Sequence, residues 1–394
     1  MTEWKECTIA DIGTVVGGAT PSTKQEDNYD GGTIAWITPK DLSGFQGRYI
    51  SHGERNITEK GLRSCSTQML PKHSILFSSR APIGYVAIAE NELCTNQGFK
   101  SVVPNENTDY LFLYYLLKYN KDAIENMGSG TTFKEVSGNT MKGIRVRVPV
   151  ELAVQKRIAS ILGSIDDKIE ENNRINNNLL EQAITLYRER FASDTSLTKV
   201  KISDIALNVT DGVHNTVIDD PNGDYFLLSC KNIKGGTLSI GCSERRINKS
   251  TFEKLRKRTK LSKGDILISS VGTIGEVLML NTEPSNYEFQ RSVAIVKPNI
   301  ELVSSPYLYL SLLTQKAELI NTAHGAVQQC LFISDISEFS ILLPNKVDMV
   351  EFTKLVVPMF DIITANENEN IRLCCLRDAL LPKLMSGEID VSEV

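Results

Sequence analysis

The fold of this chain is decided by the stretch Val154–Phe191, VQKRIASILGSIDDKIEENNRINNNLLEQAITLYRERF. The stretch contains no proline and one glycine, Gly163, and its apolar residues recur every three or four positions, as in an α-helix. At about 1.5 Å per residue, a helix of this length is a rod of roughly 57 Å, longer than a small domain is wide. Because one globular core has no room for such a stripe, we expect this helix to pack along a second long helix.

The C-terminal segment Met349–Leu384 supplies that second helix, since it carries apolar residues at the same helical spacing. In the middle of both stripes the apolar residues give way to asparagines. Asparagines that face one another between paired helices lower stability but fix the register and the partner. A solvated helix face would carry the same residues, and the sequence leaves these two interpretations open. The asparagines are Asn172, Asn173, Asn176 and Asn177 in the first segment and Asn366, Asn368 and Asn370 in the second.

The regions that precede the two long helices have similar sequences. Leu70–Gly84 matches Leu261–Gly275, and both contain Ile-Leu-x-Ser-Ser followed by Ile-Gly. Further landmarks recur in the same order. They pair Ile34–Leu42 with Tyr225–Ile233, the short helix Tyr110–Leu117 with Tyr307–Leu313, and Gly128–Lys134 with Ala323–Gln329. This order indicates a tandem duplication of one globular domain followed by one long helix.

Each repeat has the pattern of a strand-rich α+β domain. Short β-branched and aromatic runs bounded by turn residues predict strands. In the first repeat they are Ile75–Phe77, Tyr85–Ala89, Lys100–Val103 and Ile144–Val148, and in the second Ile266–Ile268, Val277–Leu280, Val293–Val296 and Phe339–Leu342. The predicted fold is two tandem α+β domains separated by two long helices that pair as an antiparallel coiled coil. The predicted segments are 1–150, 151–195 (helix), 196–344 and 345–394 (helix).

Composition excludes several classes of protein. At 394 residues with 41% hydrophobic content, the chain has the profile of a globular protein of two or three domains. It contains no apolar run long enough to span a membrane. The eight cysteines and four histidines show no zinc-binding spacing, and reduced thiols fit a cytoplasmic location best.

No motif of an active site is present. The chain lacks an Asn-Pro-Pro-Tyr tetrapeptide of adenine methyltransferases, a glycine-rich dinucleotide or S-adenosylmethionine loop, and a phosphate loop. We therefore expect no catalytic residue and no metal site in this chain.

Polar patterns that suit DNA are better represented. Although the net charge is −5, the segment Arg245–Lys263 holds nine basic residues and one acid, and such a basic island can neutralise phosphates. The matching loops 128–134 and 323–329 carry side chains that can hydrogen-bond to base edges. The candidate DNA-binding residues are Lys40, Arg80, Thr131, Thr132, Lys134, Lys231, Asn232, Arg245, Arg246, Arg256, Lys257, Arg258, Gln328 and Gln329.

Taken with the repeated domain–helix order, three motifs resemble the specificity subunit of Type I restriction–modification systems. They are the C-terminal Leu376–Val391, LRDALLPKLMSGEIDV, and the central QKRIA of 155–159 and IDDKI of 165–169. The resemblance implies two target-recognition domains that read the two halves of a bipartite double-stranded DNA site. Half-sites about one DNA turn apart, roughly 34 Å, suit a helical spacer of this length.

The resemblance also implies partners. Two methyltransferase subunits would bring S-adenosylmethionine, and two restriction subunits would bring ATP and Mg²⁺, so that this chain holds no cofactor itself. The long helical segments carry net charges of −2 and −4, and we expect these acidic helices to form the docking surface. A stand-alone two-domain DNA-binding regulator is the alternative interpretation, because it would also need two reading domains.

Overall fold

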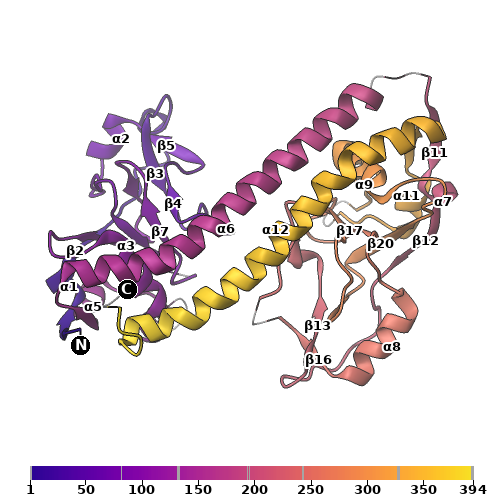
Figure 1. Cartoon of the computed structure of the whole chain (residues 1–394). Helices are drawn as coiled ribbons and strands as arrows, with labels where there is room; N and C mark the ends of the chain where they lie inside the picture. The colour runs from indigo at the N-terminus through magenta and orange to yellow at the C-terminus, as the bar shows by residue number, and fades with distance from the viewer. Residues whose placement is uncertain are drawn as a thin grey trace. The chain divides into compact units, whose positions relative to one another are not determined.

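The computed structural model describes residues 2–80, 82–130, 134–192, 194, 196–241, 244–325 and 329–391. The chain divides into two compact units, Met1–Glu171 with Glu369–Val394 and Asn172–Asn368. This division differs from the predicted segments, because each unit combines one globular domain with part of both long helices (Figure 1). The two units are described in turn.

The first unit is built on three small sheets. Strands β1 (Trp4–Thr8) and β10 (Arg145–Pro149) pair antiparallel. A five-stranded sheet has the order β2 (Gly13–Gly17), β9 (Lys100–Pro104), β6 (Ile75–Phe77), β7 (Val86–Ala89) and β4 (Tyr49–Ile50). A three-stranded sheet has the order β5 (Arg55–Ile57), β3 (Ile34–Ile37) and β8 (Cys94–Thr95). The helices are α1 (Ile9–Ile12), α2 (Glu59–Arg63), α3 (Tyr110–Tyr119), α4 (Lys121–Asn126) and α5 (Gly138–Gly143).

The second unit repeats this plan. Strands β11 (Thr198–Lys201) and β21 (Ser340–Leu343) pair antiparallel. The larger sheet is β12 (Ala206–Asp211), β20 (Val293–Pro298), β17 (Ile266–Ser269) and β18 (Val277–Met279). The smaller sheets are β16 (Arg246–Ile247), β13 (Tyr225–Leu228) and β19 (Tyr287–Phe289), and β14 (Ile233–Lys234) with β15 (Thr237–Leu238). The helices are α7 (Ile202–Ile205), α8 (Lys249–Thr259), α9 (Ser305–Thr314), α10 (Lys316–Asn321) and α11 (Ile333–Glu338).

The predicted duplication is confirmed by this element order. All eight predicted strands are present within one or two residues of their predicted bounds, and both short helices form as α3 and α9. Equivalent helices even use equivalent caps: the Thr58 hydroxyl accepts from the amide of Gly61 at the start of α2, and the Asn248 side chain accepts from the amide of Thr251 at the start of α8.

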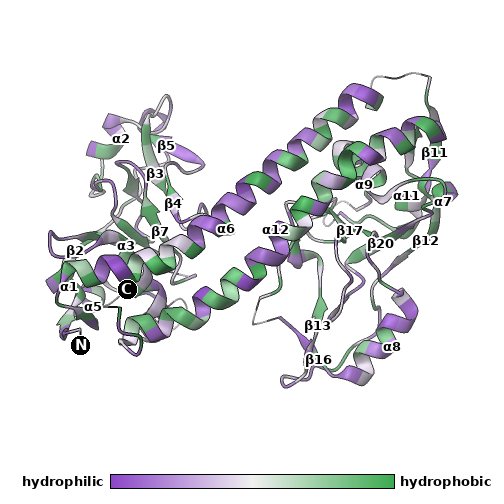
Figure 2. Ribbon diagram, viewed as in Figure 1, coloured by the Kyte–Doolittle hydropathy of each residue, from purple (hydrophilic) through white to green (hydrophobic). Residues whose placement is uncertain are grey.

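The two long helices, α6 (Leu152–Tyr187, followed by the π-helical turn Arg188–Ala192) and α12 (Lys346–Ser386), run antiparallel in both units. In the first unit Asp166 contacts Arg377 at 2.8 Å and Lys168 contacts Glu369 at 3.3 Å. In the second unit the later residues of α6 meet the earlier residues of α12, as in the 2.6 Å ion pair of Arg190 with Glu351. Figure 2 shows hydrophilic and hydrophobic residues alternating along both helices. The predicted antiparallel pairing is therefore confirmed.

Both interpretations of the asparagines hold, for different residues. The Asn366 amide donates to the Asn176 side-chain oxygen at 2.8 Å, so this pair does face across the helices. Asn172 is fully buried, whereas Asn177 is exposed.

Charged residues attach the domain of the first unit to the helices. Arg48, 4% exposed, donates to Glu170 at 2.8 and 2.9 Å, to Asp167, and to the carbonyl of Gly163 at 3.4 Å. A Cβ at position 163 would lie 3.1 Å from the Leu111 side chain of α3, a tight contact for which that side chain would have to shift. Burial alone would lower the pKa of Arg48, but the hydrogen bonds to the two carboxylates raise it, so the guanidinium stays charged.

A second buried link joins α3 to both long helices. The hydroxyl of Tyr115 donates to Asp166 at 2.6 Å, and Arg377 donates to the same carboxylate at 2.8 Å. Burial and the neighbouring carboxylate raise the pKa of Tyr115, so its hydroxyl remains the proton donor.

In the second unit an aromatic cluster attaches the domain to both long helices. Tyr187 and Phe191, at the end of α6, pack with Tyr307 of α9 and Phe352 of α12, with ring centroids 5.1–6.2 Å apart. All four rings are at most 2% exposed. The hydroxyl of Tyr307 reaches the carbonyl of Leu342 at 2.7 Å. The first unit also has apolar packing between its domain and both helices, where Ile158, Leu162 and Leu384 share one core with Phe112 and Leu113 of α3, so its ion pairs add to apolar packing.

The C-terminal segment completes the first unit. Gly387 ends α12 with a φ of 77° and lies against the Trp4 ring, where a Cβ would come within 2.8 Å of the indole nitrogen. Beyond it, Asp390 accepts from the Thr2 hydroxyl at 2.8 Å, and Val391 is 1% exposed. Among the helices in the described part of the chain, none combines the length and apolarity of a membrane span.

We predict that Arg48→Met destabilises the protein by roughly 1.5–3 kcal/mol, because it removes charged hydrogen bonds from a buried site while Asp167 and Glu170 retain some access to water. Chemical denaturation would measure the loss. The control is Arg63→Met, since Arg63 is 81% exposed and lies 3.7 Å from its partner Glu59. Equal effects of the two substitutions would show that the buried contacts contribute nothing specific.

Candidate nucleic-acid interface

The two loops predicted to read DNA are anchored in the same way in both units. In the first unit the backbone of Glu135 forms isolated β-bridges with both Ser129 and Arg80. In the second unit Cys330 forms them with both His324 and Val271. Thr131, Thr132 and Gln328 lie outside the described residues. Lys134 and Gln329 follow the two loops at matching positions, and both are exposed. The fold therefore anchors two equivalent loops, as a duplicated DNA-reading domain requires.

Where the first loop is anchored, the carboxylate of Glu135 contacts two cations. The Nε atom of Arg80 is 3.1 Å from its carboxylate, and the Nζ atom of Lys100 is 3.6 Å away. The side chain of Arg80 is 47% exposed, so part of the guanidinium remains accessible, as a DNA contact requires. Lys40 is more exposed, at 78%, and pairs with Glu54 at 2.6 Å. Exposed pairs of this kind exchange readily with a phosphate, because they contribute little stability.

Asn232, one of the predicted DNA contacts, lies in the interior of its loop. This residue is 2% exposed at the end of a short 3₁₀ turn. Its side-chain oxygen accepts from the Ser229 amide at 2.9 Å, and its NH₂ group donates to the Ser239 carbonyl at 2.9 Å. Asn232 therefore holds its own loop together. The neighbouring Lys231 is 65% exposed and pairs with Glu244 at 2.9 Å.

Arg256, another predicted DNA contact, has a role inside its own domain. Helix α8 buries Phe252 and Thr259, and Arg256 lies on that inward face. Its guanidinium donates to the carboxylate of Glu288, and to the carbonyls of Pro284 at 2.6 Å and Tyr287 at 2.9 Å. Each nitrogen of the guanidinium already has one internal acceptor, so Arg256 supports the interior of its own domain.

Glu288 is the reason for this arrangement. Its side chain is fully buried on β19. Burial raises the pKa of its carboxyl, while the hydrogen bonds from Arg256 and from the Thr259 hydroxyl at 2.9 Å act in the opposite direction. A buried carboxylate needs such partners, because an unpaired one is very costly in a protein interior.

The other arginines of the island are partly engaged. Arg245 pairs with Asp219 at 2.6 Å, and Arg246 donates to the carbonyl of Gly223 at 3.1 Å. Arg258 bonds to Asp211 at 3.1 Å and is 46% exposed. Within the described residues, the exposed cations that have no ion-pair partner on α8 and at its C-terminus are Lys254, Lys257 and Lys260. Lys257 therefore stays a candidate phosphate contact, and Lys254 and Lys260 join it. Sequence reasoning missed these two because helical spacing alone does not show which basic residues bury their charge.

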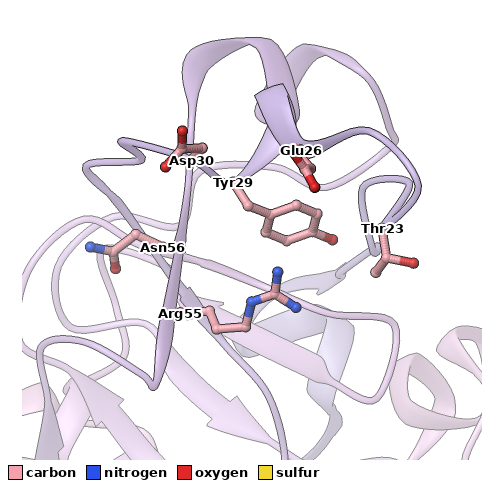
Figure 3. A pocket seen from close by; sticks show the side chains of 6 residues that line it. All are labelled: Thr23, Glu26, Tyr29, Asp30, Arg55 and Asn56. Atoms are coloured by element: carbon pink, nitrogen blue, oxygen red, sulfur yellow. The ribbon is translucent and has the colours of Figure 1, made fainter.

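A polar hollow lies beside the three-stranded sheet of the first unit (Figure 3). It has a volume of about 560 Å³ and is lined by Thr23, Glu26, Tyr29, Asp30, Arg55 and Asn56. The close-up shows the Arg55 guanidinium beneath the Tyr29 ring. Its carbon lies 4.2 Å from the ring centroid. These residues were not predicted, and no sequence motif indicates them, because the segment 23–30 and strand β5, which line the hollow, are separated in the sequence.

Across the residues that the structure describes, no group of three or more histidine, cysteine, aspartate or glutamate side chains is arranged to hold a metal ion.

Comparison with known proteins identifies the family. The model of the Type I restriction modification DNA specificity domain matches residues 1–181 and 197–372, which include both repeats. The chain therefore belongs to the family of Type I restriction–modification specificity subunits, and the resemblance in its motifs is confirmed.

Relatives match along the full length. The Type I restriction enzyme MjaIX specificity subunit of Methanocaldococcus jannaschii is 34% identical, over 100% of this chain and 95% of that protein. The Type I restriction enzyme HindI specificity subunit of Haemophilus influenzae is 22% identical, over 99% of this chain and 100% of that protein. The crystal structure of a Type I restriction–modification S subunit from M. genitalium shares the fold, with a TM-score of 0.57 at 16% identity over 98% of this chain and 96% of that one.

We predict opposite effects for two neighbouring residues of α8. Arg256→Gln should destabilise the protein by about 3–5 kcal/mol, because it leaves the buried Glu288 carboxylate without its cation. Lys257→Gln should leave stability within about 0.5 kcal/mol of the wild type. If Lys257 contacts a phosphate, its loss lowers the slope of log affinity against log salt by about 0.9.

Thermal melts and DNA titrations at several salt concentrations would measure both effects. A wild-type melt for Arg256→Gln would contradict the internal role, and a wild-type salt slope for Lys257→Gln would remove that residue from the interface.

Proposed function

We propose that this chain reads a bipartite DNA target, with one half-site for each of its two domains, as the recognition subunit of a Type I restriction–modification complex. The duplication carries this proposal: a family of DNA specificity domains is represented twice, with matching strands, caps and anchored loops. Two copies of one reader on one chain suit two half-sites joined by a fixed gap. We further propose that the paired helices set that gap.

We also propose that the chemistry belongs to partner subunits. Two methyltransferase subunits would supply S-adenosylmethionine, and two restriction subunits would supply ATP and Mg²⁺. The chain itself would contribute recognition and assembly. Its own groups would position DNA by contacts to phosphates and select it by contacts to base edges.

The docking surface that we favour differs from the acidic helices expected from charge alone. Helix α12 exposes large apolar side chains along its length: Val347, Val350, Leu355, Ile362, Ile371 and Leu376 are 44–67% exposed. By contrast, no large apolar side chain in the described part of α6 is exposed to that degree. In the second unit Leu355, Pro358 and Ile362 follow one another at helical spacing. An apolar stripe flanked by acids suits an amphipathic helix of a methyltransferase subunit.

The proposal of modular reading predicts the result of a domain exchange. Replacing residues 1–150 by the corresponding domain of a relative should change one half of the methylated site and leave the other half and the gap unchanged. Sequencing of methylated adenines in cells that express the hybrid with its methyltransferase would report all three. A change in both halves would contradict independent readers. Specific binding by the chain alone, with no methylation in the presence of the methyltransferase, would instead favour a stand-alone regulator.

The docking proposal predicts that Leu355→Asp combined with Ile362→Asp abolishes copurification with the methyltransferase. Both side chains are about half exposed, at 52% and 47%, so the isolated chain should fold. Gln182→Asp is the matched control, because it adds a charge to an exposed polar position of α6. The complex is measured by size-exclusion chromatography, and folding by a thermal melt. If the doubly substituted chain still binds the methyltransferase at wild-type stoichiometry, the docking surface lies elsewhere.

A further inference from the structure

The hollow of the first unit contains an arginine whose hydrogen-bonding capacity is unused. Arg55 lies on the edge strand β5, directly opposite Trp36 of β3. Its side chain is exposed, and within the described residues nothing accepts a hydrogen bond from its guanidinium or forms an ion pair with it. A guanidinium has five N–H donors in a planar fork. All of them are therefore available to a ligand.

The Tyr29 ring on which Arg55 stacks is held in place by its neighbours. The hydroxyl of Tyr29 donates to the carbonyl of Pro21 at 2.6 Å, and its ring meets Trp36 edge-on, with centroids 6.0 Å apart. Trp36 is 5% exposed, and its indole nitrogen donates to the carbonyl of Ala19 at 3.1 Å. The stack from Trp36 through Tyr29 to Arg55 thus leads from the interior to the surface. A planar guanidinium stacked on an anchored ring loses little freedom when it binds.

The other groups in the hollow indicate what it would contact. Glu26 and Asp30 line the same space (Figure 3), and two carboxylates there oppose the approach of a phosphate. Base edges differ from phosphates because they carry both acceptors and donors. The O6 and N7 atoms of guanine accept from an arginine fork, and the N4 amino group of cytosine donates to a carboxylate. This combination of a free arginine with acidic neighbours therefore suits a G·C pair.

The second unit shows what the same kind of stack does when it is structural. Arg256 lies 4.9 Å from the Phe252 ring, which stacks on Tyr225 at 4.2 Å. There the guanidinium donates to Glu288 and to two carbonyls, so each of its nitrogens has one internal acceptor. Arg55 is the first residue of β5, and Arg245 lies directly before β16. Arg245 is held by Asp219 and by the carbonyl of Val217 at 2.9 Å. The first unit has the stack without the internal acceptors, so the Arg55 guanidinium is open to an external one.

We propose that Arg55, stacked on Tyr29, is a specificity-determining residue that forms two hydrogen bonds to a guanine in the half-site read by the first domain. The proposal rests on the proposed function, DNA recognition by each domain. It adds a residue and a base, which domain homology does not provide.

The test uses the complete methyltransferase complex with the full chain. Methylated-adenine sequencing of the wild type first defines the target, and titrations then compare the cognate duplex with duplexes that carry one altered base pair. Arg55→Lys retains the charge but loses the fork. It should reduce the preference for one G·C pair of the first half-site by about 5- to 150-fold, with the salt dependence unchanged. Tyr29→Leu should reduce the preference at that same pair, because the guanidinium loses its platform.

Arg63→Lys is the matched control, since Arg63 is a highly exposed arginine of the same unit on α2. It should retain the wild-type preference at every position. Wild-type discrimination by Arg55→Lys at all positions would overturn the proposal and leave the proposed function intact. A uniform weakening by Arg55→Gln, with a salt slope lower by about 0.9, would also overturn it, because that result indicates a phosphate contact. Failure of the wild-type complex to select any sequence would overturn the proposed function and this inference with it.

Discussion

The structure depends on one constraint: a long amphipathic helix has to bury an apolar stripe that no single small domain can cover. The chain meets this constraint by pairing α6 with α12, and each globular domain then packs on neighbouring parts of both helices. This explains why the compact units do not coincide with the repeats in the sequence. The first unit takes its second helix from the far end of the chain, together with the residues that follow it.

Both units attach their domain to the long helices by apolar packing, and the first unit adds buried charges. In the first unit the domain is held by Arg48 and by the carboxylate of Asp166, which are buried charges with several hydrogen bonds. In the second unit four aromatic rings pack between α9 and the two long helices. Buried ion pairs depend strongly on geometry, whereas apolar packing depends on area and shape. The two copies of the fold therefore share an apolar attachment, which the first unit supplements with buried polar contacts.

Some basic residues of the second unit support its interior, and others face solvent. Within one turn of α8, Arg256 serves a buried carboxylate and Lys257 faces solvent. In the first unit Arg55 has an aromatic support and no internal acceptor within the described residues. Local charge density therefore identifies a region that suits DNA, but the pairing of each cation identifies the residues that can contact it.

The sequence by itself determined the duplication, the antiparallel helices and the family, because these depend on periodicity and on contiguous motifs that survive without three-dimensional context. It could not distinguish Asn232 or Arg256 from true surface residues, because burial depends on partners that are remote in the chain, such as Ser239 and Glu288. Nor could it indicate Arg55, whose platform comes from Tyr29 and Trp36 on other segments. Tertiary structure decides which polar groups are already satisfied internally, and only the remainder is available to bind DNA.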